Sequence, residues 1–333
     1  MNQNYITKSD NKEKPLVTVC IATCNRSNVI EVALKSVIGQ KYGHLDVVIV
    51  DDFSNDETKE LIEKYSGKDN RIRYFRHDRN EGLAAARNTA IFNAKGKYFT
   101  FIDDDDQWDP QFVESFADLA ERYEERWCFC CGQRFINKKG LTTYIIPEMD
   151  GNLIDYIRKG YTPPTSAQFY STSMLRKVGG YDERIKSGVD HDLWLTLAFN
   201  NCYIKSINGC LSFFGSDVAY GRITGDITKR RGEIELSLDI WKEKIVKHEG
   251  NEFYSHFVKS YRAYLDVMLF TEALKKRNLL SALKIFIRND SKKYIISYVA
   301  NLFLGQLKRY IKSSGKLEVK LNSYLLPYVA KNQ

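Results

Sequence analysis

The sequence contains no long apolar run. Nothing in its 333 residues approaches the roughly 20 clean apolar residues of a membrane-spanning helix. The N-terminal segment, MNQNYITKSDNKEKP, is polar and lacks the apolar core of a signal peptide. Internal repeats and low-complexity tracts are also absent. These absences favour a globular protein in the cytoplasm, either free or peripheral on the cytoplasmic face of the membrane.

Histidine and cysteine give little sign of a soft-metal site. The five histidines are scattered, and seven cysteines is an odd number that predicts free thiols in a reducing compartment. Cys128, Cys130 and Cys131 lie together in WCFCCGQRF, where the alternation is typical of a strand. Zinc would need a second pair of ligands, which the sequence does not supply. Buried strand cysteines are therefore favoured over zinc.

The charge is mildly basic. The formal net charge is +8 and the pI is about 8.9, with 43% hydrophobic and 28% charged residues. Such a balance favours anionic partners, which include nucleotide diphosphates, phospholipid head groups and nucleic acid. No basic and aromatic pattern of nucleic-acid binding is present, so no nucleic-acid partner is expected.

The first hundred residues alternate short apolar runs with helical segments, a pattern typical of βαβ units and a parallel sheet. The run LVTVCIA is nearly continuous, as in a strand buried on both faces. In the first helix, Glu31 is placed to close a capping box on Asn28. The predicted fold class is α/β, a mostly parallel sheet flanked by helices. Strands are expected at Leu16–Ala22, Asp46–Asp52, Arg71–His77 and Lys97–Ile102, with helices at about 28–39, 57–65 and 82–93.

The remaining chain mixes elements and then becomes helical. From about Gly232 onward it is rich in Lys, Leu, Ile and Tyr, with little Gly or Pro, which predicts a helical C-terminal region. The expected domains are a flexible segment at 1–14, an α/β domain at 15–230 and a helical region at 231–333. Before that region, helices are expected at Phe112–Tyr123 and Asp190–Asn200, strands at Trp127–Ile136, Tyr203–Ile207 and Leu211–Phe214, and a turn at Asn137–Gly140.

Four consecutive aspartates follow the fourth predicted strand, in FIDDDDQWDP (Phe101–Pro110). Adjacent carboxylates repel one another unless positive charge lies beside them, and ligands bind at the carboxyl ends of strands in open α/β sheets. Hard oxygen ligands of this kind suit Mg²⁺ or Mn²⁺. The alternative is a solvated acidic loop that caps the helix beginning at Pro110.

Two further motifs lie at predicted strand ends or helix starts. Asp51 and Asp52 follow the second strand in VIVDDFSNDET, and they are available to a ribose or a base if Ser54–Asp56 cap the next helix. In NEGLAAARNTA the small residues permit close packing of a helix. Arg87, within that motif, is a candidate bidentate donor to a diphosphate.

Taken in order, these motifs resemble glycosyltransferase family 2, whose catalytic domain has the GT-A fold. The resemblance covers about residues 15–215. Several motifs in the right order make it much more specific than any one of them. Besides the three motifs above, it is carried by TCNR (Thr23–Arg26), GQKY (Gly39–Tyr42), GKYFTFIDDDDQW (Gly96–Trp108), VGGYDE (Val178–Glu183) and VDHDLWL (Val189–Leu195).

The resemblance implies that the donor is a nucleotide sugar, bound by about residues 15–108. Asp52, helped by Asp51, would recognise the uracil or an equivalent base. The loop of Thr23, Asn25 and Arg26 would line the same pocket.

The resemblance also implies a D-x-D motif at Asp103–Asp105. Asp105 would be the principal ligand of Mn²⁺ or Mg²⁺, with Asp103 supporting it and Asp104 near the ribose. The metal would offset the charge that develops on the leaving diphosphate.

The acceptor side, about 109–230, would carry Asp190 as the general base. It would deprotonate the acceptor hydroxyl, which attacks the anomeric carbon opposite the diphosphate and inverts its configuration. Without the resemblance, an aspartate at a helix start is most often an N-cap. Val189 departs from the family, which usually has a glutamate before the base. Ala22 and Cys24 replace the usual proline and tyrosine of the first loop.

The expected reaction is transfer of one sugar, from a UDP-hexose or UDP-N-acetylhexosamine to a glycan or lipid-linked glycan in bacterial-type surface polysaccharide synthesis. Processive synthases would carry a Gln-x-x-Arg-Trp sequence, which is absent. A sugar-1-phosphate nucleotidyltransferase would open with a glycine-rich loop, whereas TCNR has no glycine. A non-catalytic nucleotide-sugar protein is disfavoured by the presence of both Asp105 and Asp190.

The C-terminal region lies beyond the resemblance. Tyr294–Lys316 is amphipathic with basic residues at both ends, which is typical of an interfacial helix on an anionic membrane. The alternative is packing on the catalytic domain or on a second subunit of a homo-oligomer.

Overall fold

The structure, a computed structural model, describes residues 14–136, 142–145, 148–158, 163, 165–214, 227–275, 278–287 and 317–319. The chain divides into two compact units. The first comprises Met1–Ile157, Thr162–Tyr220 and Glu318–Leu321, and the second Arg158–Tyr161, Gly221–Leu317 and Asn322–Gln333. The predicted turn at Asn137–Gly140 and the amphipathic stretch Tyr294–Lys316 lie outside the described residues.

Four parallel strands form the part of the sheet that was predicted from the sequence. They are β1 (Val17–Thr23), β2 (Leu45–Asp51), β3 (Ile72–Arg76) and β4 (Tyr98–Asp103), paired in the order β4-β1-β2-β3. All seven residues of β2 are buried, as expected for an apolar run covered on both faces. The predicted strands and their parallel pairing are confirmed.

Mixed strands extend the sheet beyond β4. β9 (Gln168–Ser171) pairs antiparallel with β4 and with β6 (Trp127–Ile136). β10 (Tyr203–Phe214) runs parallel to β6 with shifts in register between Ser206 and Ser212. The two short strands predicted here are therefore one irregular strand. The same sheet contains β5 (Gln107–Trp108), β7 (Thr142–Ile145), β8 (Asp150–Asn152) and β11 (Leu317–Val319).

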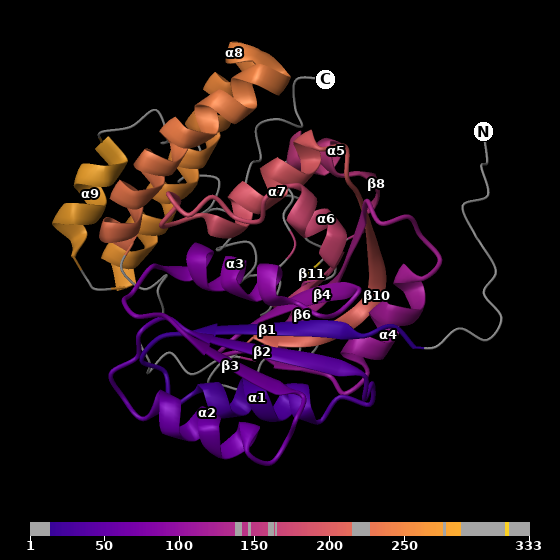
Figure 1. Ribbon diagram of the computed structural model, residues 1–333. Coiled ribbons are helices and arrows are strands. Elements are labelled where there is room, and N and C mark those ends of the chain that lie inside the picture. Colours follow the sequence, from indigo (N-terminus) through magenta and orange to yellow (C-terminus); the bar gives the residue numbers. More distant parts are fainter. Residues whose placement is uncertain are drawn as a thin grey trace, which may run out of the picture. The chain divides into compact units, whose positions relative to one another are not determined.

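Helices cover both faces of the parallel strands. Figure 1 shows α1 (Ile30–Ile38) and α2 (Thr58–Ser66) on one face and α3 (Leu83–Asn93) on the other. α3 lies close against β1 and β2, as its run of small residues permits. The first unit also contains α4 (Phe112–Ala120), the 3₁₀ turn η1 (Thr165–Ala167), α6 (Thr172–Lys177), α7 (Val189–Phe199) and all but the last residue of α5 (Leu153–Arg158).

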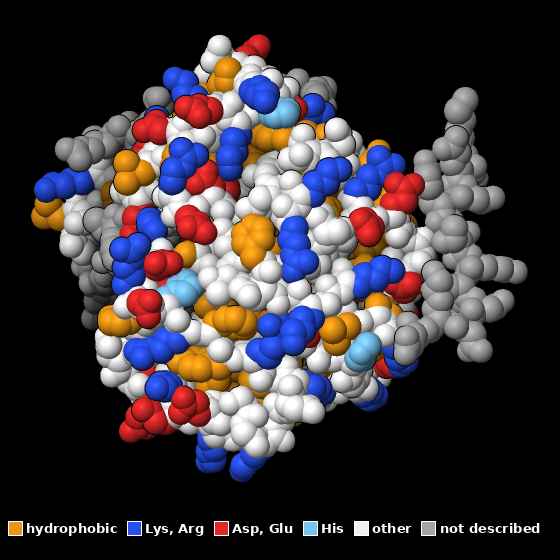
Figure 2. Space-filling model, viewed as in Figure 1, with side chains coloured by type: hydrophobic (Ala, Val, Ile, Leu, Met, Phe, Trp, Pro, Cys, Tyr) orange, Lys and Arg blue, Asp and Glu red, His pale blue; other side chains and the backbone are white. Residues whose placement is uncertain are grey.

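The second unit is mostly helical in its described residues. α8 (Ile227–Lys275) is broken at Gly250, where φ is 83°, and α9 (Leu279–Ile287) packs against it. No helix among the residues that the structure describes is long and apolar enough to span a bilayer. Over the face shown in Figure 2, Lys and Arg side chains are interspersed with Asp and Glu, so the basic charge does not gather there into one patch.

The predicted capping box at the start of α1 is wrong. The helix begins at Ile30, and Val29 caps it without a side-chain hydrogen bond. The Glu31 carboxylate instead accepts a hydrogen bond of 2.6 Å from the Tyr65 hydroxyl on α2. Glu31 was predicted to bond to the backbone at the start of its own helix, and it bonds to a side chain on another helix instead.

Asp46 is a buried polar centre of the sheet. Its carboxylate accepts hydrogen bonds from the Thr18 hydroxyl at 2.7 Å, the Arg73 Nε at 2.7 Å and the Lys95 amide at 2.9 Å. Burial alone would raise the pKa of Asp46, but the bonds from Arg73, Lys95 and Thr18 outweigh it and hold the pKa below its usual value. The ionised carboxylate therefore stabilises the fold.

Asp46→Asn is expected to lower the free energy of unfolding by about 3 kcal/mol, because it leaves the Arg73 charge without its counter-ion. Because the folded-state pKa is depressed, the contribution of Asp46 is fully present above about pH 4 and is lost as the pH falls through the folded-state value. Denaturant unfolding at neutral and acidic pH measures both effects. The exposed Asp118→Asn serves as control. Equal stability of the two variants at neutral pH would contradict this role.

Candidate active site

The carboxyl ends of the four parallel strands bring the predicted site residues to one edge of the sheet. The last residues of these strands are Thr23, Asp51, Arg76 and Asp103. The amide of Asp52 donates a 2.9 Å hydrogen bond to the Thr23 carbonyl, which ties the loops after β1 and β2 together. This is the edge where open α/β sheets bind ligands.

The loop after β1 lies against the aspartate run. The Thr23 hydroxyl donates to Asp104 at 2.8 Å. The Arg26 guanidinium lies 2.7 Å from Asp105 and 3.3 Å from Asp104. Asn25 has a φ of 54°, and its side-chain carbonyl accepts a hydrogen bond from the Asn55 amide. Thr23 and Arg26 thus join the aspartates, while Asn25 joins the loop after β2.

Arg87 joins Asp103 to Asp190 across more than a hundred residues of sequence. One terminal nitrogen, Nη1, donates to Asp190 Oδ1 at 2.6 Å, and the other, Nη2, donates to Asp103 Oδ1 at 2.9 Å. The hydroxyl of Thr165 donates to the second oxygen of Asp190 at 2.8 Å. The carboxylate of Asp190 is held from two sides, yet its side chain remains 34% exposed.

Asp190 is not the N-cap of α7. The helix begins at Val189, and the cap is Gly188, which has a left-handed φ of 81° and makes no side-chain cap hydrogen bond. The Asp190 carboxylate is bonded to Arg87 and Thr165 instead. The capping alternative raised by the sequence therefore does not explain this residue.

Asp51 and Asp52 use their carboxylates inside the fold. Asp51 is fully buried and accepts hydrogen bonds from the Ser54 amide and the Tyr74 hydroxyl. Asp52 accepts hydrogen bonds from the amides of Glu81 and Gly82, both at 2.8 Å. The expectation that capping by Ser54–Asp56 would leave both aspartates free was wrong, because Ser54 itself donates to Asp51. Asp52 orders the loop that leads into α3.

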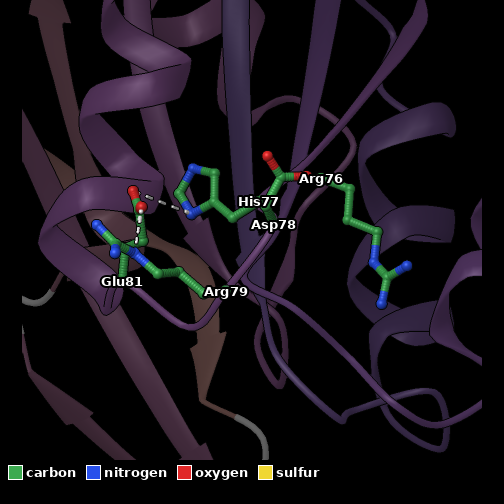
Figure 3. A pocket seen from close by; sticks show the side chains of 5 residues that line it. All are labelled: Arg76, His77, Asp78, Arg79 and Glu81. Carbon is green, nitrogen blue, oxygen red and sulfur yellow. Dashed lines mark hydrogen bonds and ion pairs between the residues drawn. The ribbon is translucent and has the colours of Figure 1, made fainter.

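A pocket of about 460 Å³ opens beside Asp52, lined by Arg76, His77, Asp78, Arg79 and Glu81 (Figure 3). The His77 ring is fixed at both nitrogens, which lie 2.8 Å from Asp52 and 2.9 Å from the Thr89 hydroxyl. Hydrogen bonds fix the His77 ring in the wall of this pocket, and the lining side chains carry charges of both signs. The pocket is therefore a polar recess near the carboxyl ends of the parallel strands.

Arg87 does not extend toward solvent as a diphosphate ligand would. Its side chain is 2% exposed, and its guanidinium lies over the rings of Phe101 and Tyr181, 5.4 and 5.5 Å from their centres. The prediction that Arg87 reaches a diphosphate is not supported, because both terminal nitrogens already bind carboxylates.

The aspartate run has the chemistry of a divalent-metal site. Asp103, Asp104 and Asp105 meet Arg26 and Arg87 in ion pairs, and Asp190 shares Arg87, so carboxylates predominate. Burial raises the pKa of Asp104 to about 7, and the neighbouring carboxylates add to the rise against the lowering effect of Arg26. The Arg26 charge 3.3 Å away therefore offsets only part of the effect of burial on Asp104.

The metal that fits is one that needs few protein ligands. Within the described part of the chain, no three His, Cys, Asp or Glu side chains converge as metal ligands. Mg²⁺ and Mn²⁺ commonly take one or two carboxylates and complete their shell with water and phosphate. The donor set therefore suits this class of ion in the presence of a phosphate-bearing ligand. Cys128, Cys130 and Cys131 are buried free thiols in β6, as predicted.

Sequence reasoning missed several residues of this site. Thr165 supports Asp190, and the Ser166 hydroxyl accepts a hydrogen bond from the Asp103 amide. His77, which the sequence analysis does not single out, lies 2.8 Å from Asp52 and orients it. No local pattern marks these residues, since each acts on a partner at least 25 positions away.

Comparison with known proteins adds independent findings. The family described as Glycosyl transferase family 2 matches residues 18–178. An uncharacterized glycosyltransferase of Rickettsia felis is 35% identical over 187 residues, which are 56% of this chain and 30% of that protein. The putative teichuronic acid biosynthesis glycosyltransferase TuaG of Bacillus subtilis is 39% identical over 101 residues, 30% of this chain and 40% of that protein. The chain spans 30% to 59% of the length of the first curated relatives that it matches.

Solved structures show the same fold. S. aureus TarS 1–349 in complex with UDP-GlcNAc has a TM-score of 0.57 at 20% identity, covering 73% of this chain and 70% of that one. The mannosyltransferase PcManGT of Pyrobaculum calidifontis, in complex with GDP-Man and Mn²⁺, has a TM-score of 0.53 at 16% identity, covering 91% and 89%. The predicted fold, a GT-A-type α/β sheet flanked by helices with a helical C-terminal region, is confirmed.

The family match includes the loop after β1, both aspartate motifs and Arg87, whereas Asp190 lies beyond it. The strand order, the motifs and the relatives agree on one assignment. Residues 18–178 therefore form a family 2 glycosyltransferase domain within this chain.

Proposed function

We propose that this glycosyltransferase is metal-dependent and inverting, and that it transfers one sugar from a nucleoside-diphosphate donor. The donor is a UDP-hexose or a UDP-N-acetylhexosamine, and the acceptor is a glycan or lipid-linked glycan of a surface polysaccharide. The observation that carries the proposal is the Arg87 bridge, which sets the partly exposed Asp190 carboxylate beside the aspartate run.

In this proposal Asp190 is the general base. The acceptor hydroxyl gives its proton to Asp190 as its oxygen attacks the anomeric carbon, and the nucleoside diphosphate leaves from the opposite side. One in-line displacement converts an α-linked donor into a β-linked product. A positioned base of this kind contributes typically about 10²–10⁴-fold to rate.

The donor end is proposed to lie along the loops after β1 and β4. Asp105, supported by Asp103, would hold Mn²⁺ or Mg²⁺, which when bound offsets charge on the leaving diphosphate. Asp104 lies beside Thr23 and Arg26, where the ribose is proposed to bind. The nucleobase of the donor is proposed to bind in the polar pocket beside Asp52.

The relatives support the biological setting. TuaG carries teichuronic acid biosynthesis in its name, and a relative from Escherichia coli, WcaA, carries colanic acid biosynthesis. Both names refer to surface polysaccharides. The UDP-GlcNAc in the TarS structure, and the GDP-Man and Mn²⁺ in the PcManGT structure, support a nucleoside-diphosphate-sugar donor and a divalent metal.

Thermal-shift measurement with a panel of nucleotides and nucleotide sugars, each with Mn²⁺ or with EDTA, tests the proposed donor class. A UDP-sugar that raises the melting temperature only with Mn²⁺ is the expected result. Stabilisation of similar size by every nucleoside diphosphate in EDTA would contradict metal-dependent donor binding.

We also propose that the helical C-terminal region contacts an anionic membrane surface. Leu279 and Leu280 on α9 are each 70% exposed and Leu283 is 55% exposed, with the exposed Lys284 beside them. Apolar side chains beside basic ones suit the interface of an anionic bilayer. A surface of this kind would bring the enzyme to a lipid-linked acceptor.

Replacing Leu279, Leu280 and Leu283 with serine is expected to weaken binding to phosphatidylserine liposomes by about tenfold or more, because three apolar side chains no longer enter the interface. Flotation measures the bound fraction. Phe92→Ser, which removes an exposed apolar side chain from the first unit, is the control and should bind normally. Equal flotation of the triple variant and wild type would remove the proposed membrane contact.

A further inference from the structure

We infer that Arg87 is a positioning residue that fixes the proposed base and the aspartate run as one unit. The inference rests on the proposed function, since it assigns Asp190 its role as base. Arg87 itself contacts neither donor nor acceptor in this account. It acts through the two carboxylates that it bridges.

The geometry uses the forked shape of the guanidinium. Two terminal nitrogens of one planar group bind two separate carboxylates, at 2.6 Å on Asp190 and 2.9 Å on Asp103. A planar, permanently charged fork can hold two acceptors at a fixed separation, which the single ammonium of lysine does less well. The distance between the base and the end of β4 is therefore set by one rigid group.

The surroundings of Arg87 leave the guanidinium little freedom. The side chain is 2% exposed and lies over the rings of Phe101 and Tyr181. It extends from α3, where Ala84, Ala85 and Ala86 are buried and allow the helix to lie close to the sheet. The buried guanidinium is compatible with folding because both of its terminal nitrogens are paired with carboxylates.

Adjacent residues of η1 also hold the two aspartates, Asp190 by its carboxylate and Asp103 by its backbone amide. The Thr165 hydroxyl binds Asp190, and the Ser166 hydroxyl accepts from the Asp103 amide. The two aspartates that Arg87 joins, Asp103 and Asp190, are thus both hydrogen-bonded to η1. A change at Arg87 should consequently disturb the base and the metal-binding end together.

Arg87→Met is expected to lower donor turnover about 100-fold, because misplacing a reacting group by about 1 Å costs that much. It should also weaken Mn²⁺-dependent UDP binding about tenfold, as loss of a group supporting a metal ligand typically does. Turnover is measured as UDP released from a UDP-sugar, and binding by calorimetry with UDP and Mn²⁺. Arg87→Lys, which keeps the charge without the fork, carries the test if the methionine variant does not fold.

The double variant Arg87→Met/Asp190→Asn separates coupling from two independent losses. If Arg87 acts through Asp190, its removal in the Asp190→Asn background should cost turnover about threefold or less. UDP binding with Mn²⁺ should still be weakened by Arg87→Met in that background, because this effect depends on the contact between Arg87 and Asp103.

Arg176→Met is the matched control. Arg176 anchors the other end of α3 by donating to the backbone carbonyls of Ile91 and Ala94, so these contacts involve no carboxylate. It should lower stability without changing turnover per folded molecule or UDP affinity. The inference is overturned if Arg87→Met, like Arg176→Met, leaves turnover per folded molecule and UDP affinity unchanged. It is also overturned if the double variant loses turnover by the full product of the two single losses. Wild-type turnover in Asp190→Asn would instead overturn the proposed function.

Discussion

Asp190→Asn is expected to lower turnover by about 10²–10⁴-fold while nucleotide affinity stays nearly unchanged. The substitution keeps the shape of the side chain and an oxygen for Arg87 but removes the basic carboxylate. In the proposed site the donor binds along the loops after β1 and β4, and Asp190 is linked to Asp103 at the end of β4 through Arg87. Loss confined to the chemical step is therefore the signature of a general base.

The control for this variant is Asp192→Asn on the same helix. Asp192 is buried, and its carboxylate accepts a hydrogen bond from the Asp182 amide. Its replacement should lower stability and leave turnover per folded molecule close to wild type. The measurement is UDP release from the donor, with and without acceptor, alongside UDP titration. Near wild-type turnover in Asp190→Asn would remove the base assignment.

Asp105→Ala is expected to abolish the Mn²⁺-dependent part of donor affinity, a loss of about 100-fold or more, since changes that only support a ligand already cost 10–100-fold. The fold should survive, because the Asp105 side chain is 23% exposed and its ion pair with Arg26 lies at the sheet edge. Calorimetry with UDP, once in Mn²⁺ and once in EDTA, gives the metal-dependent difference directly.

The same comparison separates a metal ligand from a mere partner of Arg26. If Asp105 only orders Arg26, the variant should weaken UDP binding equally in Mn²⁺ and in EDTA. Arg26→Ala then reproduces the effect and serves as the matched variant. An unchanged difference between Mn²⁺ and EDTA in Asp105→Ala would show that the metal assignment is wrong.

Most of the parallel sheet follows from the sequence because its elements obey local rules. The strand that contains Val48 and Ile49 is apolar on both faces, and the small residues from Ala84 to Ala86 predict a closely packed helix. The family motifs then make the aspartate run the candidate ligand site. These features depend on residues near one another in the chain, so the sequence displays them directly.

The partners of the site residues could not be predicted in the same way. Arg87 was expected to face a diphosphate, yet it binds Asp190, 103 positions away. Glu31 was expected to cap α1 and instead binds Tyr65 on α2. A charged or polar side chain takes the partner that the tertiary fold presents. For the buried Arg87, leaving the charge unpaired would cost more than any local hydrogen bond returns.

The nucleotide product formed from a UDP-sugar tests the central claim most directly. The protein is incubated with the donor, Mn²⁺ and an acceptor extract, and the nucleotides are separated by chromatography. We expect UDP to appear only with metal, and at least a hundredfold more slowly with Asp190→Asn, which is about the lower bound for loss of a general base. UTP and sugar 1-phosphate formed on addition of pyrophosphate, or UDP released equally by wild type and Asp190→Asn, would contradict it.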